Sequence, residues 1–156
     1  MSDKLFLIPI GRDGTPVGYS GELTDVAREV VHATVGLYET AGFTEPWIGY
    51  FAVRGSTLVG TCAFKSPPSD GRVEIAYCTF PEFEGQGVAT SMARQIVALA
   101  ESRAPESVVA AQTLPEPNAS HRILEKIGFR HVSTLDHPDD GEVWEWHLVP
   151  SDPASR

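Results

Sequence analysis

The chain has 156 residues, of which 42% are hydrophobic and 21% charged, and its formal net charge is -9. This length allows one domain with its own apolar core, and no apolar run approaches the roughly 18 residues of a membrane-spanning helix. The acidic balance, with no cluster of Lys or Arg, argues against nucleic acid or an anionic membrane as a partner and permits a cationic small substrate.

The start of the chain, MSDKLFLIPIGRDG, has a short apolar core and an early acidic residue, Asp3. A secretory signal has a longer apolar region behind a basic start, so we expect a cytoplasmic protein. Cys62 and Cys78 lie inside apolar, strand-like runs without the spacing of metal ligands. We therefore expect two reduced, buried thiols, with no disulfide and no metal site.

Hydrophobic periodicity predicts a series of strands and helices along the chain. Apolar residues at helical spacing, such as Val26, Val30 and Leu37, indicate the first helix, and Gly42 marks its end. Short glycine-bearing connections between β-rich runs predict hairpins. In chain order we expect a strand over 4–10, a helix over 22–42, strands over 47–53, 58–65 and 72–80, a long helix over 87–104, a strand over 107–113, a short helix over 118–128, and strands over 129–135 and 142–149.

This order of elements predicts a mixed α/β fold with antiparallel segments and one crossover through the long helix. The sequence contains no internal repeat and no linker rich in Pro, Gly or Ser between two halves. We therefore expect a single domain over residues 1–150, followed by a flexible tail over 151–156.

The stretch TFPEFEGQGVATSMARQIVALA passes from a strand through Gly85 and Gly87 into the long helix. Two glycines at such a junction let a ligand approach the backbone closely, and the first N–H groups of a helix bind anions. A P-loop would need Lys and Ser or Thr after the second glycine, where this chain has Val88, Ala89 and Thr90. A dinucleotide-binding turn would need a third glycine. A plain tight turn is the alternative.

A second stretch, LPEPNASHRILEKIGF, leaves a strand through prolines and enters a short helix with Asn118 as its expected N-cap and Gly128 at its end. Together with PEFEGQGVATSMA, it resembles the GNAT superfamily of N-acetyltransferases, in particular the branch related to ribosomal-protein N-terminal acetyltransferases. The resemblance extends from Trp47 to Leu148. It implies a GNAT-like fold with a central, mostly antiparallel twisted sheet of about seven strands, with splayed middle strands and flanking helices.

The resemblance also implies a binding site for acetyl-coenzyme A as cosubstrate. Backbone N–H groups at the start of the long helix would bind the diphosphate, beside Glu84, where the family usually has Gln or Arg. The pantetheine arm would pair with the exposed edge of the strand before the glycine loop. The residues implied to bind the cosubstrate are Tyr77, Cys78, Thr79, Gly85, Gln86, Gly87, Val88, Ala89, Thr90 and Asn118.

Acetyl transfer to an amine needs a base, a polarised thioester carbonyl and a proton for the leaving thiolate. The resemblance implies that Glu74 is the base. The alternative is that Glu74 is only a solvent-facing strand residue beside Arg72. A backbone N–H near Thr79 would polarise the carbonyl. The tyrosine acid of the family is replaced by Leu124, so the thiolate either leaves unassisted or takes a proton from another group, for which Ser120 and His121 are the nearest candidates.

Aromatic and imidazole side chains near the end of the chain have simpler expected roles. His121 is expected to be a solvated helix residue. Trp144 and Trp146 lie two positions apart in a strand and share one face, so we expect them in the core or against a second copy in a homodimer.

The sequence thus predicts an enzyme that transfers an acetyl group from acetyl-coenzyme A to a primary amine of a small molecule, peptide or protein. The expected mechanism is direct transfer in a ternary complex. One alternative is a GNAT-like regulatory module that binds acyl-coenzyme A without turnover, which Glu84 and Leu124 favour. A purely structural or interaction domain is a third possibility.

Overall fold

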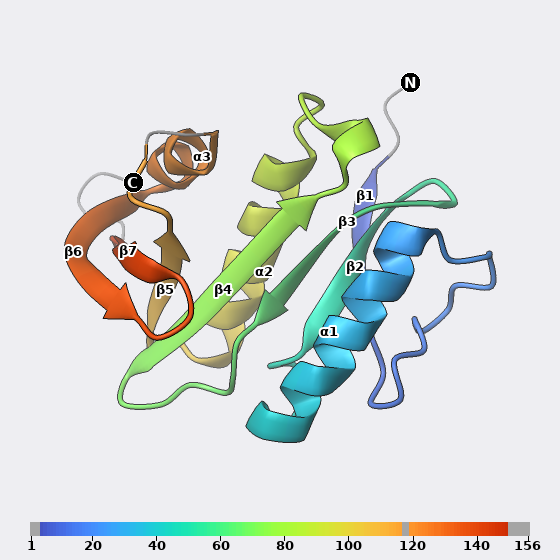
Figure 1. Cartoon of the computed structure of the whole chain (residues 1–156), viewed down its shortest axis with the longest axis horizontal. Helices are drawn as coiled ribbons and strands as arrows, with labels where there is room; N and C mark the ends of the chain where they lie inside the picture. The colour runs from blue at the N-terminus through green and yellow to red at the C-terminus, as the bar shows by residue number, and fades with distance from the viewer. Residues whose placement is uncertain (1–3, 117–118, 150–156) are drawn as a thin grey trace.

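The computed structural model describes residues 4–116 and 119–149. Every strand and helix expected from the sequence is present, with ends shifted by a few residues, and a short 3-10 turn over Pro81–Phe83 is added (Figure 1). The predicted N-cap Asn118 and the predicted tail lie outside the described residues. The elements are β1 (Leu5–Pro9), α1 (Asp25–Ala41), β2 (Gly49–Arg54), β3 (Thr57–Phe64), β4 (Arg72–Thr79), α2 (Val88–Arg103), β5 (Val108–Thr113), α3 (Ala119–Ile127), β6 (Phe129–His137) and β7 (Gly141–Leu148).

The strands form one seven-stranded sheet in the order β1-β2-β3-β4-β5-β7-β6. Among the described strands, β4 and β5 are the one parallel pair, and all other neighbours are antiparallel. A parallel pair needs a crossover connection, and α2 provides it. The predicted mostly antiparallel sheet with one helical crossover is confirmed.

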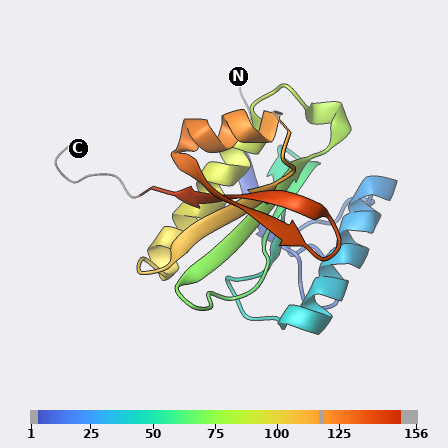
Figure 2. The ribbon, with the colours of Figure 1, turned by 60° about the vertical axis from the view of Figure 1, so that its left-hand side comes forward.

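The helices cover opposite faces of the sheet. Figure 2 shows α1 on one side and α2 with α3 on the other. The helix α2 packs against β3 and β4 through side chains that recur every three or four positions, which is the spacing of one helix face. Its buried residues are Val88, Met92, Ala93, Ile96, Val97 and Ala100. Within the described residues, none of the helices is both long enough and apolar enough to cross a membrane.

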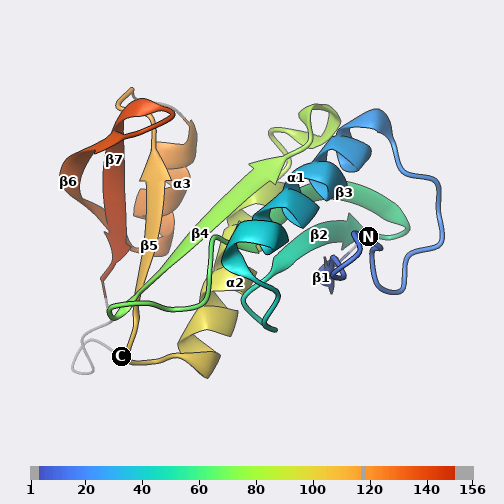
Figure 3. The same cartoon turned by 60° about the horizontal axis from the view of Figure 1, so that its bottom comes forward.

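The two middle strands separate halfway along their length. Residues 72–75 of β4 pair with residues 108–111 of β5, and beyond them the strands have no paired residues. Figure 3 shows β4 diverging from β5 toward its C-terminal end. The predicted splay is therefore confirmed, and it leaves the last four residues of β4 with a partner strand, β3, on one side only.

Gly60 allows β3, β4 and α2 to pack closely. A Cβ atom at this position would lie 2.8 Å from the backbone oxygen of Cys78 and 2.9 Å from Cε of Met92. The Met92 side chain could move, but the backbone oxygen of the neighbouring strand could not do so without disturbing the sheet. A side chain at position 60 is therefore incompatible with the present spacing of the two strands.

We predict that Gly60→Ala lowers the free energy of unfolding by about 1–3 kcal/mol, because the new methyl group overpacks the contact between the strands. Gly36→Ala is the matched control, since nothing lies within 4 Å of its added Cβ on the exposed face of α1. That control should stabilise the protein by up to about 1 kcal/mol through helix propensity. Urea unfolding measures both, and a neutral or stabilising Gly60→Ala would contradict this packing argument.

Candidate active site

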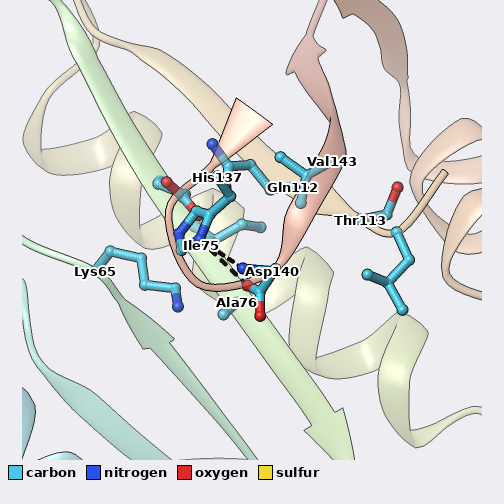
Figure 4. Close-up of a pocket in the computed structure, with 10 residues that line it drawn as sticks. Lys65, Ile75, Ala76, Gln112, Thr113, His137, Asp140 and Val143 are labelled. Carbon is cyan, nitrogen blue, oxygen red and sulfur yellow. Dashed lines mark hydrogen bonds and ion pairs between the residues drawn. The ribbon is translucent and has the colours of Figure 1, made fainter. Parts of the chain in front are cut away.

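The splay between β4 and β5 is bordered by two cavities. One, of about 540 Å³, is lined by the end of β4, the glycine loop and the first residues of α2 and α3. The other, of about 440 Å³, is lined by residues of β4, β5 and the β6–β7 hairpin (Figure 4). A third cavity of about 340 Å³ lies between α1 and the strands β3 and β4. We call them the loop cavity, the hairpin cavity and the helix cavity.

The backbone of β4 directs hydrogen-bonding groups toward the splay. The Glu74 carbonyl accepts from Lys65 N at 2.9 Å, and Phe80 N donates to the Val59 carbonyl at 2.9 Å, so even-numbered residues bond to β3. In a strand, alternate residues bond to opposite neighbours. The N–H and C=O groups of Tyr77 and Thr79 therefore face the side from which β5 has diverged.

The side chains of Tyr77 and Thr79 line the loop cavity. Their hydroxyl oxygens are buried and form no hydrogen bond with any described residue. Burial raises the pKa of Tyr77 to about 12. Buried polar atoms without partners are costly, so two of them along one cavity fit a ligand that carries hydrogen-bonding groups, such as the amides of pantetheine.

The glycine loop has the geometry of an anion site. Gly85 and Gly87 have φ angles of 78° and 80°, in the left-handed region, and a Cβ atom on either would meet no described residue within 4 Å. The space above the loop is thus open, and glycine is required for conformation rather than for packing against protein. Gly87 caps α2, and within residues 4–116 and 119–149 no side chain bonds to the N–H groups of the first turn, which begins at Val88. These N–H groups and the helix dipole suit a phosphate.

Arg54 is a positive charge next to the glycine loop that sequence analysis missed. Its Nη2 donates to Oε1 of Gln86 at 2.7 Å, and its guanidinium lies 5.7 Å from the centre of the Phe83 ring. Glu84, which is exposed and lines the loop cavity, adds a negative charge to the same region. No local pattern could have shown the contact, because Arg54 and Gln86 are 32 residues apart.

The structure places Ser120 in the wall of the loop cavity, together with Ala119 and Ile123 of α3. Leu124, which replaces the family tyrosine, is fully buried and belongs to the core. Asn118, the predicted pantetheine contact, lies outside the described residues. Ser120 is therefore the described hydroxyl of α3 that faces the cavity.

The expectation that His121 is solvated was wrong. Its side chain is 6% exposed, and its Nε2 lies 3.0 Å from Oγ1 of Thr113 and 3.1 Å from the Leu114 carbonyl. Its ring stacks on Trp144 with centroids 5.0 Å apart, and Trp146 Nε1 donates to the same Thr113 hydroxyl at 2.9 Å. His121 thus fastens α3 to β5 and β7. The tryptophan pair packs on one face as predicted, with Trp146 in the core.

Cys78 also differs from its expected environment, because it is exposed while Cys62 is buried. Side chains alternate along β4, and Val73 and Ile75 point into the core on the α2 side. Cys78 therefore faces the opposite side, where it lines the helix cavity. Burial raises the pKa of the Cys62 thiol to about 12. Among residues 4–116 and 119–149, no group of His, Cys, Asp or Glu could hold a metal ion.

Glu74 lines the hairpin cavity, on the other face of β4 from Tyr77. Its side chain is 16% exposed, and Oε1 accepts a hydrogen bond of 3.1 Å from Nη2 of Arg72. The arginine is shared with Glu145, to which it donates through Nε at 2.7 Å and Nη2 at 2.6 Å. Glu74 is thus both beside Arg72 and on the wall of a cavity.

Glu145 is the centre of a buried polar network that sequence analysis missed. Its carboxylate also accepts from Gln112 Nε2 at 3.1 Å and lies 2.8 Å from Nε2 of His147. Burial alone would raise the pKa of Glu145, but the hydrogen bonds from Arg72, His147 and Gln112 outweigh it and lower the pKa to about 2. The network joins β4, β5 and β7 at the closed end of the splay.

The comparisons with known proteins agree with the fold. The family profile described as an acetyltransferase (GNAT) domain matches residues 21–130. The human N-acetylaspartate synthetase is 29% identical over 89 residues, which cover 56% of this chain and 29% of that protein. The chain thus spans less than a third of the length of this curated relative.

Two solved structures share the fold at low sequence identity. A spermidine N-acetyltransferase chimera that includes the Vibrio cholerae enzyme has a TM-score of 0.68 at 14% identity, covering 93% of this chain and 95% of that one. An acetyltransferase from Salmonella typhimurium that modifies the N-terminal serine of a ribosomal protein has a TM-score of 0.61 at 14% identity, covering 83% and 77%.

We predict that Glu145→Gln lowers the free energy of unfolding at neutral pH by about 3 kcal/mol, because Arg72 loses its charged partner. The folded-state pKa of Glu145 is lower than its ordinary value of 4.5, so its contribution is present above pH 4.5 and is lost as the pH falls toward 2. The difference between wild type and variant should therefore shrink by more than half by about pH 3.

Urea unfolding at several pH values measures this difference. Glu142→Gln makes the same change at an exposed position of the same strand and should have little effect at any pH. Equal effects of the two substitutions would show that the buried network contributes no stability.

Proposed function

The chain belongs to the GNAT acetyltransferase family, and we propose that it transfers the acetyl group of acetyl-coenzyme A directly to a primary amine in a ternary complex. One observation carries this proposal. The splayed strand β4 has an anion-binding loop and two unpartnered hydroxyls on one face and the carboxylate of Glu74 on the other.

The loop cavity would bind the cosubstrate. The first N–H groups of α2, from Val88 onward, would hold the diphosphate, with Arg54 close by to offset the negative charge of Glu84. The pantetheine arm would take the place of the missing strand beside β4 and bond to the backbone of Tyr77 and Thr79. This arrangement would bring the thioester to the splay, next to the face that carries Glu74.

The hairpin cavity would hold the acceptor amine. The amine nitrogen attacks the thioester carbonyl carbon, and the C–N bond forms as the C–S bond breaks. Glu74 accepts a proton from the amine through the carboxylate oxygen that Arg72 does not bind. Arg72 fixes the direction of this carboxylate through its hydrogen bond to Oε1.

The leaving thiolate needs a proton or a hydrogen bond. Ser120 is placed to supply it, since its hydroxyl lies in the wall of the loop cavity. A thiol with an ordinary pKa near 8.5 is already a fair leaving group, so weak assistance suffices. This explains how the site can work with Leu124 buried in the core instead of a tyrosine at that position.

The relatives point to different acceptors. The human relative is named for the synthesis of N-acetylaspartate, and one structural neighbour acts on spermidine. These acceptors have opposite charges and share an amine, which supports an amine acceptor and leaves the rest of the molecule open. We further propose that the protein is cytoplasmic and that it can form a homodimer.

A regulatory module that binds acyl-coenzyme A without turnover is the second candidate, and the absence of a tyrosine at Leu124 favours it. The two functions differ in one measurement. Incubation with acetyl-coenzyme A and a panel of amines releases free thiol if the protein is an enzyme. A protein that binds coenzyme A and releases no thiol with any amine or peptide would be the module.

We predict that coenzyme A raises the melting temperature of the wild type and that Gly87→Val reduces this shift, with coenzyme A affinity lower by roughly tenfold or more. The valine side chain would occupy the open space above the loop and strain a residue with φ of 80°.

Gly18→Val is the matched control, because Gly18 has φ of 83°, has nothing within 4 Å of an added Cβ and lies in the loop after β1. Like Gly87→Val, this substitution should lower the free energy of unfolding by roughly 1–3 kcal/mol through backbone strain. It should leave the affinity for coenzyme A unchanged. If both variants bind coenzyme A as the wild type does, the glycine loop is a plain turn.

We predict that Glu74→Gln lowers kcat near neutral pH by roughly 100-fold, the usual effect of losing a general base, and leaves the affinity for acetyl-coenzyme A unchanged. The amide oxygen can still accept from Arg72, so the fold is kept. Raising the pH should partly restore turnover, because solution then supplies more of the free amine. Steady-state kinetics with an accepted amine from pH 6 to about pH 10 measure this.

Glu101→Gln makes the same charge change on the exposed side of α2 and should behave as the wild type. Near-normal activity of Glu74→Gln across the pH range would instead assign Glu74 to the polar network alone.

A further inference from the structure

A second charged residue, Lys65, faces the hairpin cavity from the end of β3. Its backbone N donates to the Glu74 carbonyl at 2.9 Å, so the two residues lie directly opposite each other on neighbouring strands. Residues in this relation have side chains on the same face of the sheet. Figure 4 shows Lys65 at the edge of the cavity, across from the β6–β7 turn that carries His137 and Asp140.

Lys65 makes no salt bridge with any described residue. Opposite charges on facing strand residues usually attract each other, but the Glu74 carboxylate is held by Arg72 at 3.1 Å. Asp140, on the far wall, lies 3.6 Å from Nδ1 of His137 instead. Lys65 is exposed, so its ammonium group is available to a ligand.

Lys65 lies at the junction of two cavities. It lines both the hairpin cavity and the helix cavity, as does Ala76. Among the described residues that line these cavities, Lys65 is the one Lys or Arg. Its side chain therefore supplies the permanent positive charge of the acceptor site.

We infer that the acceptor is a free amino acid, whose carboxylate binds the Lys65 ammonium while its amine lies beside Glu74. This inference rests on the proposed function. An amine acceptor without a negative charge would leave Lys65 unpaired, and a polyamine would bring further positive charge toward it. An amino acid carries both charges a short distance apart, as the two facing residues do. The hairpin cavity, at about 440 Å³, has the size of a small-molecule site.

The same charges favour release of the product. Acetylation converts the cationic ammonium group into a neutral amide with the loss of two protons, of which one passes to Glu74 and the other to the leaving thiolate. The product therefore keeps the carboxylate that binds Lys65 and loses the charge that was attracted to Glu74 and Asp140. It should bind less tightly than the substrate.

The experiment compares the common amino acids with their α-amides, with spermidine and with a tripeptide amide. Thiol release from acetyl-coenzyme A measures turnover, and calorimetry on the protein saturated with coenzyme A measures acceptor binding without turnover. At least one amino acid should exceed its α-amide by about tenfold or more in kcat/KM and in affinity. The amide is the weaker base and has more free amine, so amine basicity cannot cause this preference.

Lys65→Gln should abolish the preference, because it lowers the affinity and kcat/KM for the amino acid about tenfold. The values for the α-amide and the affinity for coenzyme A should change little. Lys4→Gln is the matched control, because it removes the same charge from an exposed position before β1 and should keep the preference. If the ratio of amino acid to α-amide kcat/KM is the same in Lys65→Gln as in the wild type, the inference is overturned. A wild type that prefers amides or spermidine would also overturn it.

The two readouts separate this inference from the proposed function. Thiol release with spermidine or the peptide amide, but with no amino acid, would support acetyl transfer and overturn the amino acid acceptor. Amino acid binding that depends on Lys65, with no thiol release from any amine, would support the carboxylate site and overturn the acetyl transfer. Absence of both binding and release for every amino acid would also overturn the inference.

Discussion

The separation of β4 from β5 after Ile75 is the constraint on which the rest of the site depends. Two parallel strands normally stay hydrogen-bonded to the end of the shorter strand. For β4 and β5 to separate halfway, other contacts must hold them together at one end and apart at the other. Arg72 and Glu145 hold the closed end, because their two short hydrogen bonds tie β4 to β7 across β5. At the open end, His121 and the tryptophan pair fix α3 to β5 and β7, away from β4.

The open end then acquires opposite electrostatic characters on its two faces. The face toward α2 has the free N–H groups of a helix start behind Gly87 and suits an anion. The other face has Glu74 and Lys65 on neighbouring strands and suits a molecule with both charges. A thioester bound along β4 would lie between these faces, which is the arrangement that direct transfer requires.

Local sequence patterns predicted the elements, because helix periodicity, strand alternation and glycine turns depend on neighbours within a few residues. The glycine loop before α2 was found for this reason. The Arg72–Glu145 contact spans 73 residues and has no local signal. The burial of His121 and the exposure of Cys78 depend on which face of an element meets the core, and short apolar runs do not specify it. The binding and catalytic roles of the site residues stay predictions.

The central claim is that coenzyme A occupies the splay as an added strand along β4, and amide hydrogen exchange resolved by residue tests it most directly. Coenzyme A should slow exchange at the amides of Tyr77 and Thr79, which face the splay, and at those of Val88 to Thr90. The Cys78 amide faces β3 and should change much less. Equal protection of all three β4 amides would indicate general stabilisation of the fold, and no protection at Tyr77 and Thr79 would contradict the claim.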